Sequence, residues 1–410
     1  MSLAPHLAPP VATHDPHDPD DPVRALRGRR VLLISPQAWN GLKLSKHHYA
    51  LELARRGSEV FFLNPPSGTG VRPRVSQGPC PNLWIVDYSQ ISRGRRFLPA
   101  AVNDAIESIQ AGIVQRALKA PVDVVWSFDP ARFTVLTEFD AQLHFFHAAD
   151  RVEPEAVRRI GASAVAVISV SDLILADFAP TGIPRFFVNH GLAEEYAGLA
   201  REQLARLSDG PECRASPPQK VGYVGNLLRP DIDHAAFSRI VQENADIQFH
   251  LWGPHEYSAL DWEHQGVPEV TEFISFLGQR TNVVMHGLKT PAEVAAALFG
   301  MDMLLTCYDP LREMNRASNN HKVLEYLSTG KPVVTNHVST YVRRGIPEGL
   351  LCMPDTLDNS GLPALFRRTV ETLAEWSTAE KQKERIRFAL ANTYADQLRI
   401  IDSIAAKLLR

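Results

Sequence analysis

A lysine and a glutamate three residues apart carry the most specific chemistry in this sequence. Lys322 and Glu325 follow a polar loop that ends in Asn319 and Asn320, and asparagine is a favourable N-cap of a helix. Residues three apart share one face of a helix, so we expect the two charges side by side. An ammonium group beside free helix amides suits a pyrophosphate, and a carboxylate suits a ribose diol. The pair therefore predicts a nucleotide site; the alternative is two charges on a solvated helix face.

The residues around this pair resemble the nucleotide-sugar site of a known enzyme family. Residues 319–334 read Asn-Asn-His-Lys-Val-Leu-Glu-Tyr-Leu-Ser-Thr-Gly-Lys-Pro-Val-Val. They are similar to the Asn-Pro-x-Lys-x-x-Glu-Tyr-x-x-x-Gly-Lys-Pro-Val-Val signature of family-4-type retaining glycosyltransferases (glycosyltransferase group 1), particularly the bacterial capsule and teichuronic-acid enzymes. The resemblance implies that Lys322 and the amides near Asn320 and His321 contact a diphosphate, and that Glu325 binds the ribose. Two positions depart from the pattern: Asn320 replaces the signature proline, and Ala317 replaces the upstream glutamate of the family's Glu-x7-Glu spacing.

Alternating strands and helices must position this site. The first apolar run covers residues 31–35, a helical pattern follows over 46–56, and a second strand covers 59–63, which are the lengths of a β-α-β crossover unit. Further strands of this first series are expected at residues 83–87, 122–127, 142–146, 164–168 and 185–188. Strands of a second series are expected at residues 221–225, 246–252, 281–286, 301–307 and 332–335.

Two such series predict an α/β protein with two Rossmann-like domains, each a doubly wound parallel sheet covered by helices. The family resemblance, which extends over about residues 30–410, implies the GT-B architecture, in which the two domains face a cleft. The predicted parts are a disordered tail over 1–28, an N-terminal acceptor-side domain over 29–200, a linker over 201–219, a C-terminal nucleotide-sugar-binding domain over 220–388, and a C-terminal helix over 389–410 that packs back on the first domain. Ligands of such sheets bind beyond the carboxyl ends of the strands, so the loops there are candidate sites.

Loops after the second series of strands supply the other donor-side candidates. Gly225 and Asn226 form a turn that resembles the Gly-rich opening of the family's donor domain, and a glycine lets the backbone approach phosphates closely. Gly253 ends the next predicted strand, and His286 ends the one after it. The resemblance implies that His286 faces the base, although a structural histidine fits it equally well. Arg229 is the single candidate for the basic pair that the family carries in this region.

Loops of the first series supply the acceptor-side candidates. Gly41 is expected to keep the loop over residues 39–48 thin, while Lys46 and His47 begin a helix. These two side chains either contact an acceptor or a phosphate, or are surface residues of the first helical turn. His147 and Asp150 follow a strand where the resembling enzymes carry acidic residues, which implies a role in acceptor deprotonation. The segment over 188–191 resembles the family's hinge into the linker, so His190 is expected to be architectural.

Composition excludes several other classes of protein. The net charge is −3 over 410 residues with a pI of about 6.6, which argues against a general nucleic-acid binder. The four cysteines (Cys80, Cys213, Cys307 and Cys352) have no Cys-x-x-Cys spacing, which gives no support to a zinc or redox motif and favours a reducing compartment. The N-terminus lacks an apolar signal-peptide core, and no apolar run reaches the roughly 18 residues that span a bilayer. We therefore predict a cytoplasmic protein, with no metal and no cofactor.

The predicted function is metal-independent transfer of a sugar from a nucleoside-diphosphate sugar to an acceptor that the sequence does not identify, with a polysaccharide and a lipid-linked glycan as candidates. Retention of the anomeric configuration is implied by the family resemblance alone. Lys322 and Arg229 would stabilise the leaving group. A nucleotide-sugar epimerase and an inactive nucleotide-sugar-binding protein of the same fold are the alternatives. Residues 71–120 carry seven cations against three carboxylates, including the Arg-Gly-Arg-Arg run over 93–96. This balance is compatible with a solvated basic loop, or with peripheral contact with an anionic membrane and a lipid-linked acceptor.

Overall fold

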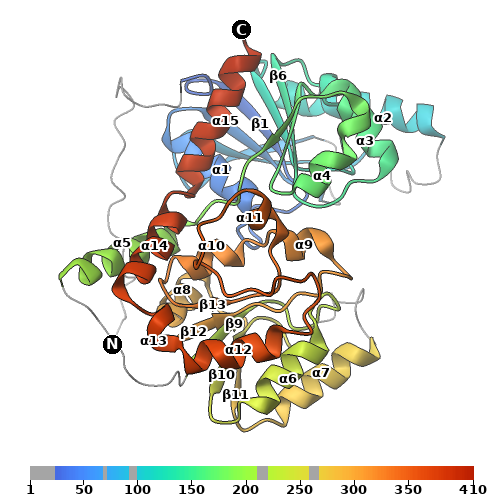
Figure 1. Ribbon diagram of the computed structural model, residues 1–410. Coiled ribbons are helices and arrows are strands. Elements are labelled where there is room, and N and C mark those ends of the chain that lie inside the picture. Colours follow the sequence, from blue (N-terminus) through green and yellow to red (C-terminus); the bar gives the residue numbers. More distant parts are fainter. Residues whose placement is uncertain (1–23, 68–71, 92–98, 210–219, 258–266) are drawn as a thin grey trace, which may run out of the picture. The chain divides into compact units, whose positions relative to one another are not determined.

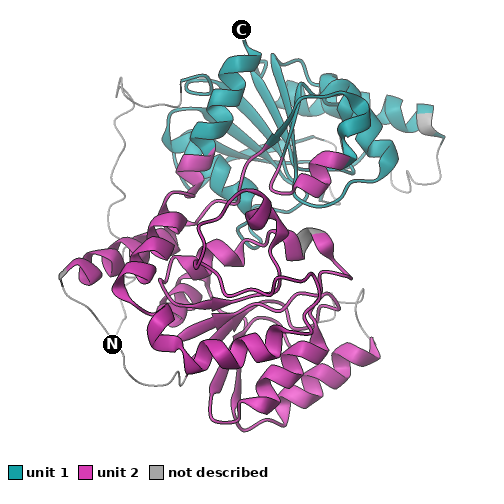
Figure 2. Ribbon diagram, viewed as in Figure 1, with its two compact units in different colours: residues 1–168, 177–186, 398–410 teal, residues 169–176, 187–397 magenta. Residues whose placement is uncertain are grey.

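The computed structural model describes residues 24–67, 72–91, 99–209, 220–257 and 267–410. Most of the tail predicted over 1–28 lies outside these ranges, as do residues 210–219 of the predicted linker and the basic run over 93–96. The chain forms two compact units, shown in different colours in Figure 2. Unit 1 comprises residues 1–168, 177–186 and 398–410, and unit 2 comprises residues 169–176 and 187–397. The chain therefore passes between the units more than once.

Unit 1 is built on an eight-stranded sheet with the strand order β3-β4-β2-β1-β5-β6-β7-β8. Its strands are β1 (Arg30–Ile34), β2 (Glu59–Leu63), β3 (Arg74–Gln77), β4 (Leu83–Asp87), β5 (Val124–Ser127), β6 (Leu143–Ala148), β7 (Ala166–Ser169) and β8 (Arg185–Phe187). Strands β5, β6 and β7 are buried along their whole length, because a parallel sheet is covered on both faces. Strand β3 was not predicted from the sequence. It is an edge strand that pairs antiparallel with β4. Its side chains are exposed or half-buried, so it lacks the apolar run that marks an interior strand.

The helices of this half of the chain lie between successive strands (Figure 1). They are α1 (Ser45–Arg55), α2 (Ala100–Ala117), α3 (Pro154–Ser163) and α4 (Asp172–Asp177), with short 3-10 turns η2 (Leu136–Glu138) and η3 (Ala179–Thr181). Gly57 ends the α1 region with a φ of 87°, a conformation that glycine adopts without steric cost. The β-α-β unit predicted from the first 63 residues is thus present.

Unit 2 contains a five-stranded parallel sheet with the order β11-β10-β9-β12-β13. Its strands are β9 (Lys220–Val224), β10 (Gln248–Trp252), β11 (Val283–Gly287), β12 (Met303–Leu305) and β13 (Val333–Val334). Alternate residues point to opposite faces of a strand. Val221 and Met303 belong to one apolar cluster, together with residues of α6 (His234–Glu243), α7 (Pro268–Gly278) and α12 (Leu362–Glu371). Leu304 and Val333 belong to another, together with residues of α8 (Pro291–Phe299) and α10 (Lys322–Leu327). Helices therefore cover both faces, as expected of a doubly wound sheet.

The helices of this second series alternate with its strands and continue to the end of the chain. They are α5 (Glu194–Asp209), α6 (His234–Glu243), α7 (Pro268–Gly278), α8 (Pro291–Phe299), α9 (Met314–Ser318), α10 (Lys322–Leu327), α11 (Ser339–Arg343), α12 (Leu362–Glu371), α13 (Leu373–Trp376), α14 (Ala379–Leu390) and α15 (Tyr394–Leu408). The predicted linker over 201–219 thus begins inside a helix, because α5 continues to Asp209. None of the helices in the described part of the chain is long and apolar enough to span a membrane.

The C-terminal helix belongs to both units. Residues 394–397 of α15 lie in unit 2, and residues 398–410 lie in unit 1. In unit 1 the Asp402 carboxylate accepts hydrogen bonds from the backbone amides of Arg24 and Leu26 at 3.0 and 2.8 Å. In unit 2 the start of this region pairs with Leu192, whose amide donates to the Asn392 carbonyl at 2.7 Å. The two segments that resemble the family's hinge and terminal helix are therefore bonded to each other.

Candidate functional site

Helix α10 carries the lysine–glutamate pair and is fixed near the carboxyl end of the central strand of unit 2. Its apolar residues Val323 and Leu327 are completely buried. The hydroxyl of Tyr326 accepts a hydrogen bond of 2.7 Å from the backbone amide of Val224, the last residue of β9. The helix is thus tied to the end of the sheet where ligands of such folds bind.

Lys322 and Glu325 form an ion pair on this helix. The Lys322 Nζ lies 2.8 Å from the Glu325 Oε2, and each side chain is only 15% exposed. The alternative of two charges on a solvated helix face is therefore wrong. The pair combines an ammonium group that suits a phosphate with a carboxylate that suits a diol, but each charge already has the other as its partner.

A tyrosine from another helix also contacts this glutamate, which sequence reasoning missed. The hydroxyl of Tyr196, on α5, lies within electrostatic reach of the Glu325 carboxylate. Burial and the charge of Glu325 raise the pKa of Tyr196, so its hydroxyl stays protonated. The two residues are 129 positions apart in the chain, and no local motif marks Tyr196. Its position in α5, close to the segment that resembles the family hinge, is visible only in the fold.

The asparagines before α10 are not its N-cap, contrary to expectation. His321 occupies the N-cap position and makes no capping hydrogen bond with its side chain. Asn319 instead points its Nδ2 to the Val170 carbonyl and to the Asn189 Oδ1, at 2.9 and 3.1 Å. Asn320 is 6% exposed, and neither its Oδ1 nor its Nδ2 has a hydrogen-bond partner among the described residues. The polar loop is therefore buried, and its side chains do not cap the helix.

His190 joins the same loop. Its Nε2 lies 3.1 Å from the Asn319 carbonyl, and its ring meets the His321 ring edge-on at 6.0 Å between centroids. The neighbouring Gly191 lies against Tyr394, where an added Cβ would come within 2.3 Å of the tyrosine ring. These contacts give His190 the architectural surroundings expected from its sequence context.

Three glycines at the strand ends form a close backbone contact on the donor side. The Gly225 amide donates to the Trp252 carbonyl at 2.9 Å, and the Gly253 amide donates to the Gly287 carbonyl at 3.0 Å. Gly253 has a φ of 135°, and a Cβ placed there would lie 1.9 Å from the Gly225 carbonyl oxygen. A side chain cannot occupy this position, so the ends of β9, β10 and β11 depend on glycine for their close approach.

His286 is stacked rather than exposed at the end of β11. Its ring is nearly parallel to that of Trp252, with 4.6 Å between centroids, and its Nε2 lies 3.0 Å from the His250 Nδ1. Burial, and then the charge of Lys289, lower the pKa of His286, which favours the neutral ring. These contacts suit a structural histidine, and the ring is also an aromatic surface beside the strand end.

The remaining donor-side residues have internal partners. The Arg229 Nε contacts both oxygens of the Asp231 carboxylate, at 2.9 and 3.0 Å. The Asn226 Oδ1 accepts a hydrogen bond from the Leu228 amide at 3.0 Å and so holds the turn after β9. The cation expected to face the diphosphate is therefore paired with a carboxylate in the same loop.

In unit 1 the loop before α1 is fastened by His47. Its Nδ1 accepts from the Leu44 amide at 3.0 Å, and its Nε2 lies 3.2 Å from the Ala38 carbonyl, so Nε2 carries the proton. The ring is fully buried and packs on Trp39, and burial lowers the pKa of His47 to about 4. The alternative of a surface residue in the first helical turn is wrong for His47. Gly41 lies in the same loop, where a Cβ would meet only the Ala38 carbonyl, at 3.3 Å.

Lys46 is buried in the first turn of α1, close to two carboxylates. Its side chain is 5% exposed, and burial lowers its pKa to about 8, although the charges of Asp150 and Asp129 oppose this shift. Asp150 lies just after β6 and is exposed, whereas His147 is buried in a ring stack, 4.7 Å from Phe128 between centroids. The structure thus brings Lys46 and Asp150 together, while His147 is packed in the core.

Asp129 is the residue of this cluster that sequence reasoning did not select. It follows β5, accepts hydrogen bonds from the amides of Ala131 and Arg132 at 2.9 and 3.1 Å, and forms an ion pair with the Arg132 guanidinium. That guanidinium also donates to the Ser35 carbonyl, at the end of β1. An aspartate placed directly after a buried strand was the available signal, because such loops form the ligand edge of the sheet. Lys46, Asp129 and Asp150 are referred to below as the Lys46 cluster.

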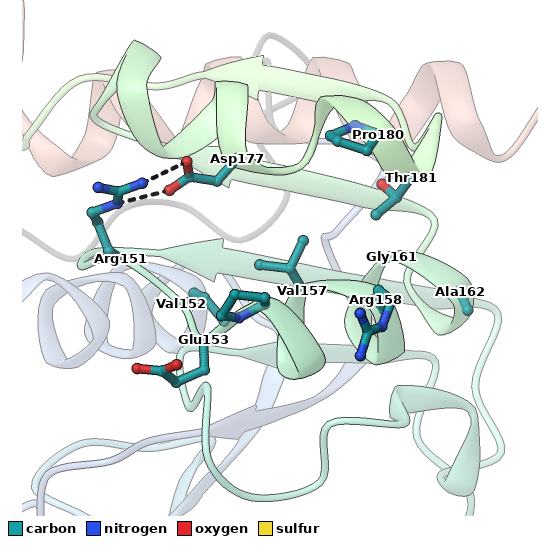
Figure 3. A pocket seen from close by; sticks show the side chains of 11 residues that line it. Arg151, Val152, Glu153, Val157, Arg158, Gly161, Ala162, Asp177, Pro180 and Thr181 are labelled. Carbon is teal, nitrogen blue, oxygen red and sulfur yellow. Dashed lines mark hydrogen bonds and ion pairs between the residues drawn. The ribbon is translucent and has the colours of Figure 1, made fainter.

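A groove in unit 1 begins directly after Asp150 and contains none of the predicted site residues. Its volume is about 830 Å³, and it runs along α3 towards η3. Figure 3 shows its apolar floor, which includes Val152 and Val157, and the Arg151 guanidinium that contacts the Asp177 carboxylate at 3.0 and 2.9 Å. The groove offers apolar area and one exposed ion pair.

Comparison with known proteins gives structural neighbours only. No family model matches the chain, and no curated protein matches its sequence. Sucrose-phosphate synthase from Thermosynechococcus elongatus has a TM-score of 0.67 at 13% identity, covering 93% of this chain and 99% of that one. HepE of Anabaena in complex with UDP and glucose has a TM-score of 0.62 at 14% identity, covering 93% and 99%. An α,α-trehalose-phosphate synthase (UDP-forming) from Burkholderia xenovorans, in complex with glucose-6-phosphate, has a TM-score of 0.65 at 11% identity, covering 93% and 99%.

These neighbours are glycosyltransferases of the GT-B fold, and the similarity extends over nearly the whole of both chains. The predicted fold class is therefore confirmed: the chain is an α/β protein of the GT-B type, with two Rossmann-like domains. At 11–14% identity the likeness shows the fold and no particular substrate.

Proposed function

We propose that this protein is a glycosyltransferase that moves a sugar from a nucleoside-diphosphate sugar to an acceptor, and that unit 2 binds the donor. The observation that carries the proposal is the mostly buried Lys322–Glu325 pair at the carboxyl end of β9, in a chain of GT-B fold. The Glu325 carboxylate accepts hydrogen bonds from the ribose, and the Lys322 ammonium turns to the diphosphate when the donor binds. The structural neighbours support UDP as the first nucleotide to test.

The leaving group is stabilised by cations of the chain rather than by a metal in this proposal. Lys322 and Arg229 each have a carboxylate partner, in Glu325 and Asp231. A diphosphate carries more negative charge than one carboxylate and competes for both cations, while Glu325 is taken up by the ribose. The expected consequence is that turnover persists in EDTA; loss of turnover that magnesium or manganese restores would contradict this part of the proposal.

Unit 1 supplies the acceptor side. The Lys46 cluster combines a buried ammonium group from the first turn of α1 with the charges of two carboxylates, Asp129 and Asp150, that follow β5 and β6. A carboxylate such as Asp150 can accept a proton from an acceptor hydroxyl, and a buried ammonium can hold an anionic group of the acceptor. The family resemblance is the support for two further parts of the proposal: retention of the anomeric configuration, and an acceptor in polysaccharide synthesis.

Peripheral contact with the inner membrane face is the remaining part of the proposal. Arg72, Arg74, Arg116 and Lys119 are exposed, and α2 also exposes Val102 and Ile109, at 45% and 57%, seven residues apart on one helix face. Cations beside an exposed apolar stripe suit an anionic bilayer surface. Co-sedimentation with phosphatidylglycerol vesicles at low salt tests this part. A protein that stays in the supernatant, or an Arg93→Ser/Arg95→Ser/Arg96→Ser variant that binds as well as wild type, argues for a soluble acceptor.

The decisive experiment is a thermal-shift screen of the protein with UDP-, GDP- and ADP-sugars, followed by turnover assays with sugars, sugar phosphates and lipid-linked acceptors. Donor binding stabilises the folded chain by mass action, so a productive donor raises the melting temperature. Release of the nucleoside diphosphate with acceptor supports a transferase. Interconversion of donor sugars without acceptor points to an epimerase, and binding without any turnover points to an inactive binding protein.

A further inference from the structure

The asparagine before α10 differs from other buried asparagines of unit 2. The Asn282 Nδ2 donates hydrogen bonds to the carbonyls of Val241 and Asn244, both at 3.1 Å. Asn336 accepts from the Tyr308 amide at 3.2 Å and donates to the Ala317 carbonyl at 3.1 Å. Asn320 is as deeply buried, at 6% exposure, yet neither its Oδ1 nor its Nδ2 has a partner among the described residues.

An unpaired buried amide is costly to the folded protein. A buried donor or acceptor without a partner loses its hydration and gains nothing in return, and native structures pair the large majority of such groups. In Asn320 both the acceptor oxygen Oδ1 and the donor nitrogen Nδ2 lack a partner among the described residues. The residue lies next to the N-cap of the helix that carries Lys322 and Glu325. A chain that folds at this cost is expected to recover it when a ligand occupies the site.

The chemistry of the amide selects the kind of ligand. A phosphate offers only acceptors, so it would pair with Nδ2 and leave Oδ1 unpaired. A hydroxyl both donates and accepts, so hydroxyl groups satisfy both ends of the amide. In the proposed function Glu325 takes the ribose hydroxyls, which leaves the hydroxyls of the transferred sugar for Asn320.

We infer that the Asn320 side chain is a specificity-determining contact that hydrogen-bonds hydroxyl groups of the donor sugar. This inference rests on the proposed function. It adds that the donor sugar is recognised by the Asn320 side chain, which the sequence pattern places only near the phosphates. The amide therefore distinguishes a nucleotide-sugar from the bare nucleotide, because only the former presents the sugar hydroxyls.

The test is the substitution Asn320→Leu, which keeps the branching and the number of non-hydrogen atoms of the side chain and removes its polar atoms. Affinities are measured by calorimetry for UDP against UDP-glucose, GDP against GDP-mannose and ADP against ADP-glucose. In the pair that wild type binds, we expect the variant to lose on the order of tenfold for the nucleotide-sugar. Its affinity for the nucleoside diphosphate is expected to stay within about twofold.

Stability without ligand provides a second readout, with Asn282→Leu as the matched control. Asn320→Leu removes unpaired polar atoms, so the melting temperature of the free protein is expected to stay unchanged or to rise by about 2–4 °C. Asn282→Leu leaves three carbonyls without their donor, so we expect it to lower the melting temperature and to leave the nucleotide-sugar affinity of the folded protein unchanged.

The outcomes separate the inference from the proposed function. If wild type binds none of the three pairs, the proposed function is contradicted and the inference with it. If wild type binds a pair and Asn320→Leu binds both members equally well, only the inference is overturned. Equal losses for the nucleotide and the nucleotide-sugar would assign Asn320 to the nucleotide, and a destabilised variant with normal affinity would show that the amide is satisfied by water within the fold; either result overturns it.

Discussion

The two units hold their candidate lysines in opposite ways. In unit 2 the Lys322 ammonium lies 2.8 Å from the Glu325 carboxylate on the same helix, and both side chains are 15% exposed. In unit 1 Lys46 is 5% exposed, and burial lowers its pKa to about 8 against the opposing charges of Asp150 and Asp129. A direct ion pair preserves a charge that a ligand can then redirect, whereas burial makes the charge itself dependent on pH. We therefore expect ligand-dependent behaviour from unit 2 and pH-dependent behaviour from unit 1.

The largest difference between the units is expected at their glycine loops. Gly253→Ala in unit 2 places a side chain at a φ of 135°, with its Cβ 1.9 Å from the Gly225 carbonyl oxygen. Gly41→Ala in unit 1 meets a single atom at 3.3 Å, at a residue whose φ is not positive. Gly253→Ala is expected to cost about 4 kcal/mol or more of stability, or to prevent folding of unit 2. Gly41→Ala is expected to cost less than about 1 kcal/mol.

Urea unfolding followed by circular dichroism measures both variants. A Gly253→Ala protein that unfolds at the wild-type midpoint would show that the strand ends of β9 and β10 tolerate separation, and the close backbone contact would then not be required for the donor side.

The second prediction tests the pH dependence expected of unit 1. The amine of Lys46 has a pKa of about 8 in the folded chain and 10.5 in the unfolded chain. Between these values the unfolded chain binds the proton and the folded chain does not, so stability rises with pH. Relative to Lys46→Met, wild type is expected to gain about 3 kcal/mol from pH 8 to pH 10.5. Below pH 8 both states are protonated, and the difference between the two proteins stays constant.

Urea unfolding of unit 1 at pH 7, 8, 9 and 10.5 measures this difference, and Lys119→Met, at an exposed lysine of the same unit, provides the matched control. Parallel stability curves for wild type and Lys46→Met across this range would mean that Lys46 keeps its charge, and the pH dependence expected of unit 1 would be absent.

The third prediction concerns donor binding by unit 2. Glu325→Ala removes the carboxylate that pairs with Lys322 and lies near the Tyr196 hydroxyl. Donor affinity is expected to fall by about 2 kcal/mol, because the ribose loses charge-assisted hydrogen bonds in a mostly buried site. Calorimetry on the folded variant measures the loss, with Glu371→Ala as a surface control that breaks the exposed Arg367 pair. Unchanged donor affinity in Glu325→Ala would remove the ribose assignment.

The elements of the fold were predictable from the sequence because buried parallel strands are apolar runs. The runs at 31–35 and 221–225 correspond to β1 and β9, each shifted by one residue. The exposed edge strand β3 has no such run and was missed. The division of the chain was less visible, because the first domain was predicted to continue to residue 200 and a linker to follow over 201–219, whereas residues 187–209 belong to unit 2 and include all of α5.

The site was predictable where its chemistry is local. Lys322 and Glu325 are three residues apart, and helical geometry alone brings them together. Tyr196 and Asp129 join their clusters through tertiary packing across long sequence separations, which no local pattern encodes. The burial of single side chains could not be predicted from the sequence either. A surface position in the first helical turn was one of the two alternatives for His47, but the residue is fully buried. Its ring nitrogens are hydrogen-bonded to the backbone of the loop before α1.

The smallest expected effect concerns Tyr196, and it distinguishes the contribution of this tyrosine from that of the Lys322–Glu325 ion pair. Tyr196→Phe keeps the buried ring and removes the hydroxyl near the Glu325 carboxylate, so Glu325 is expected to keep its pair with Lys322 and lose part of its orientation. We expect the KM for the donor to rise about fivefold, corresponding to about 1 kcal/mol, with little change in kcat, because binding rather than chemistry is affected. Tyr394→Phe is the matched control, since burial and then the charge of Glu325 raise the pKa of Tyr394 as well, by less than they raise that of Tyr196. A kcat that falls while KM stays constant would place Tyr196 in the chemical step, and equal behaviour of the two variants would leave Lys322 as the partner that holds Glu325 in place.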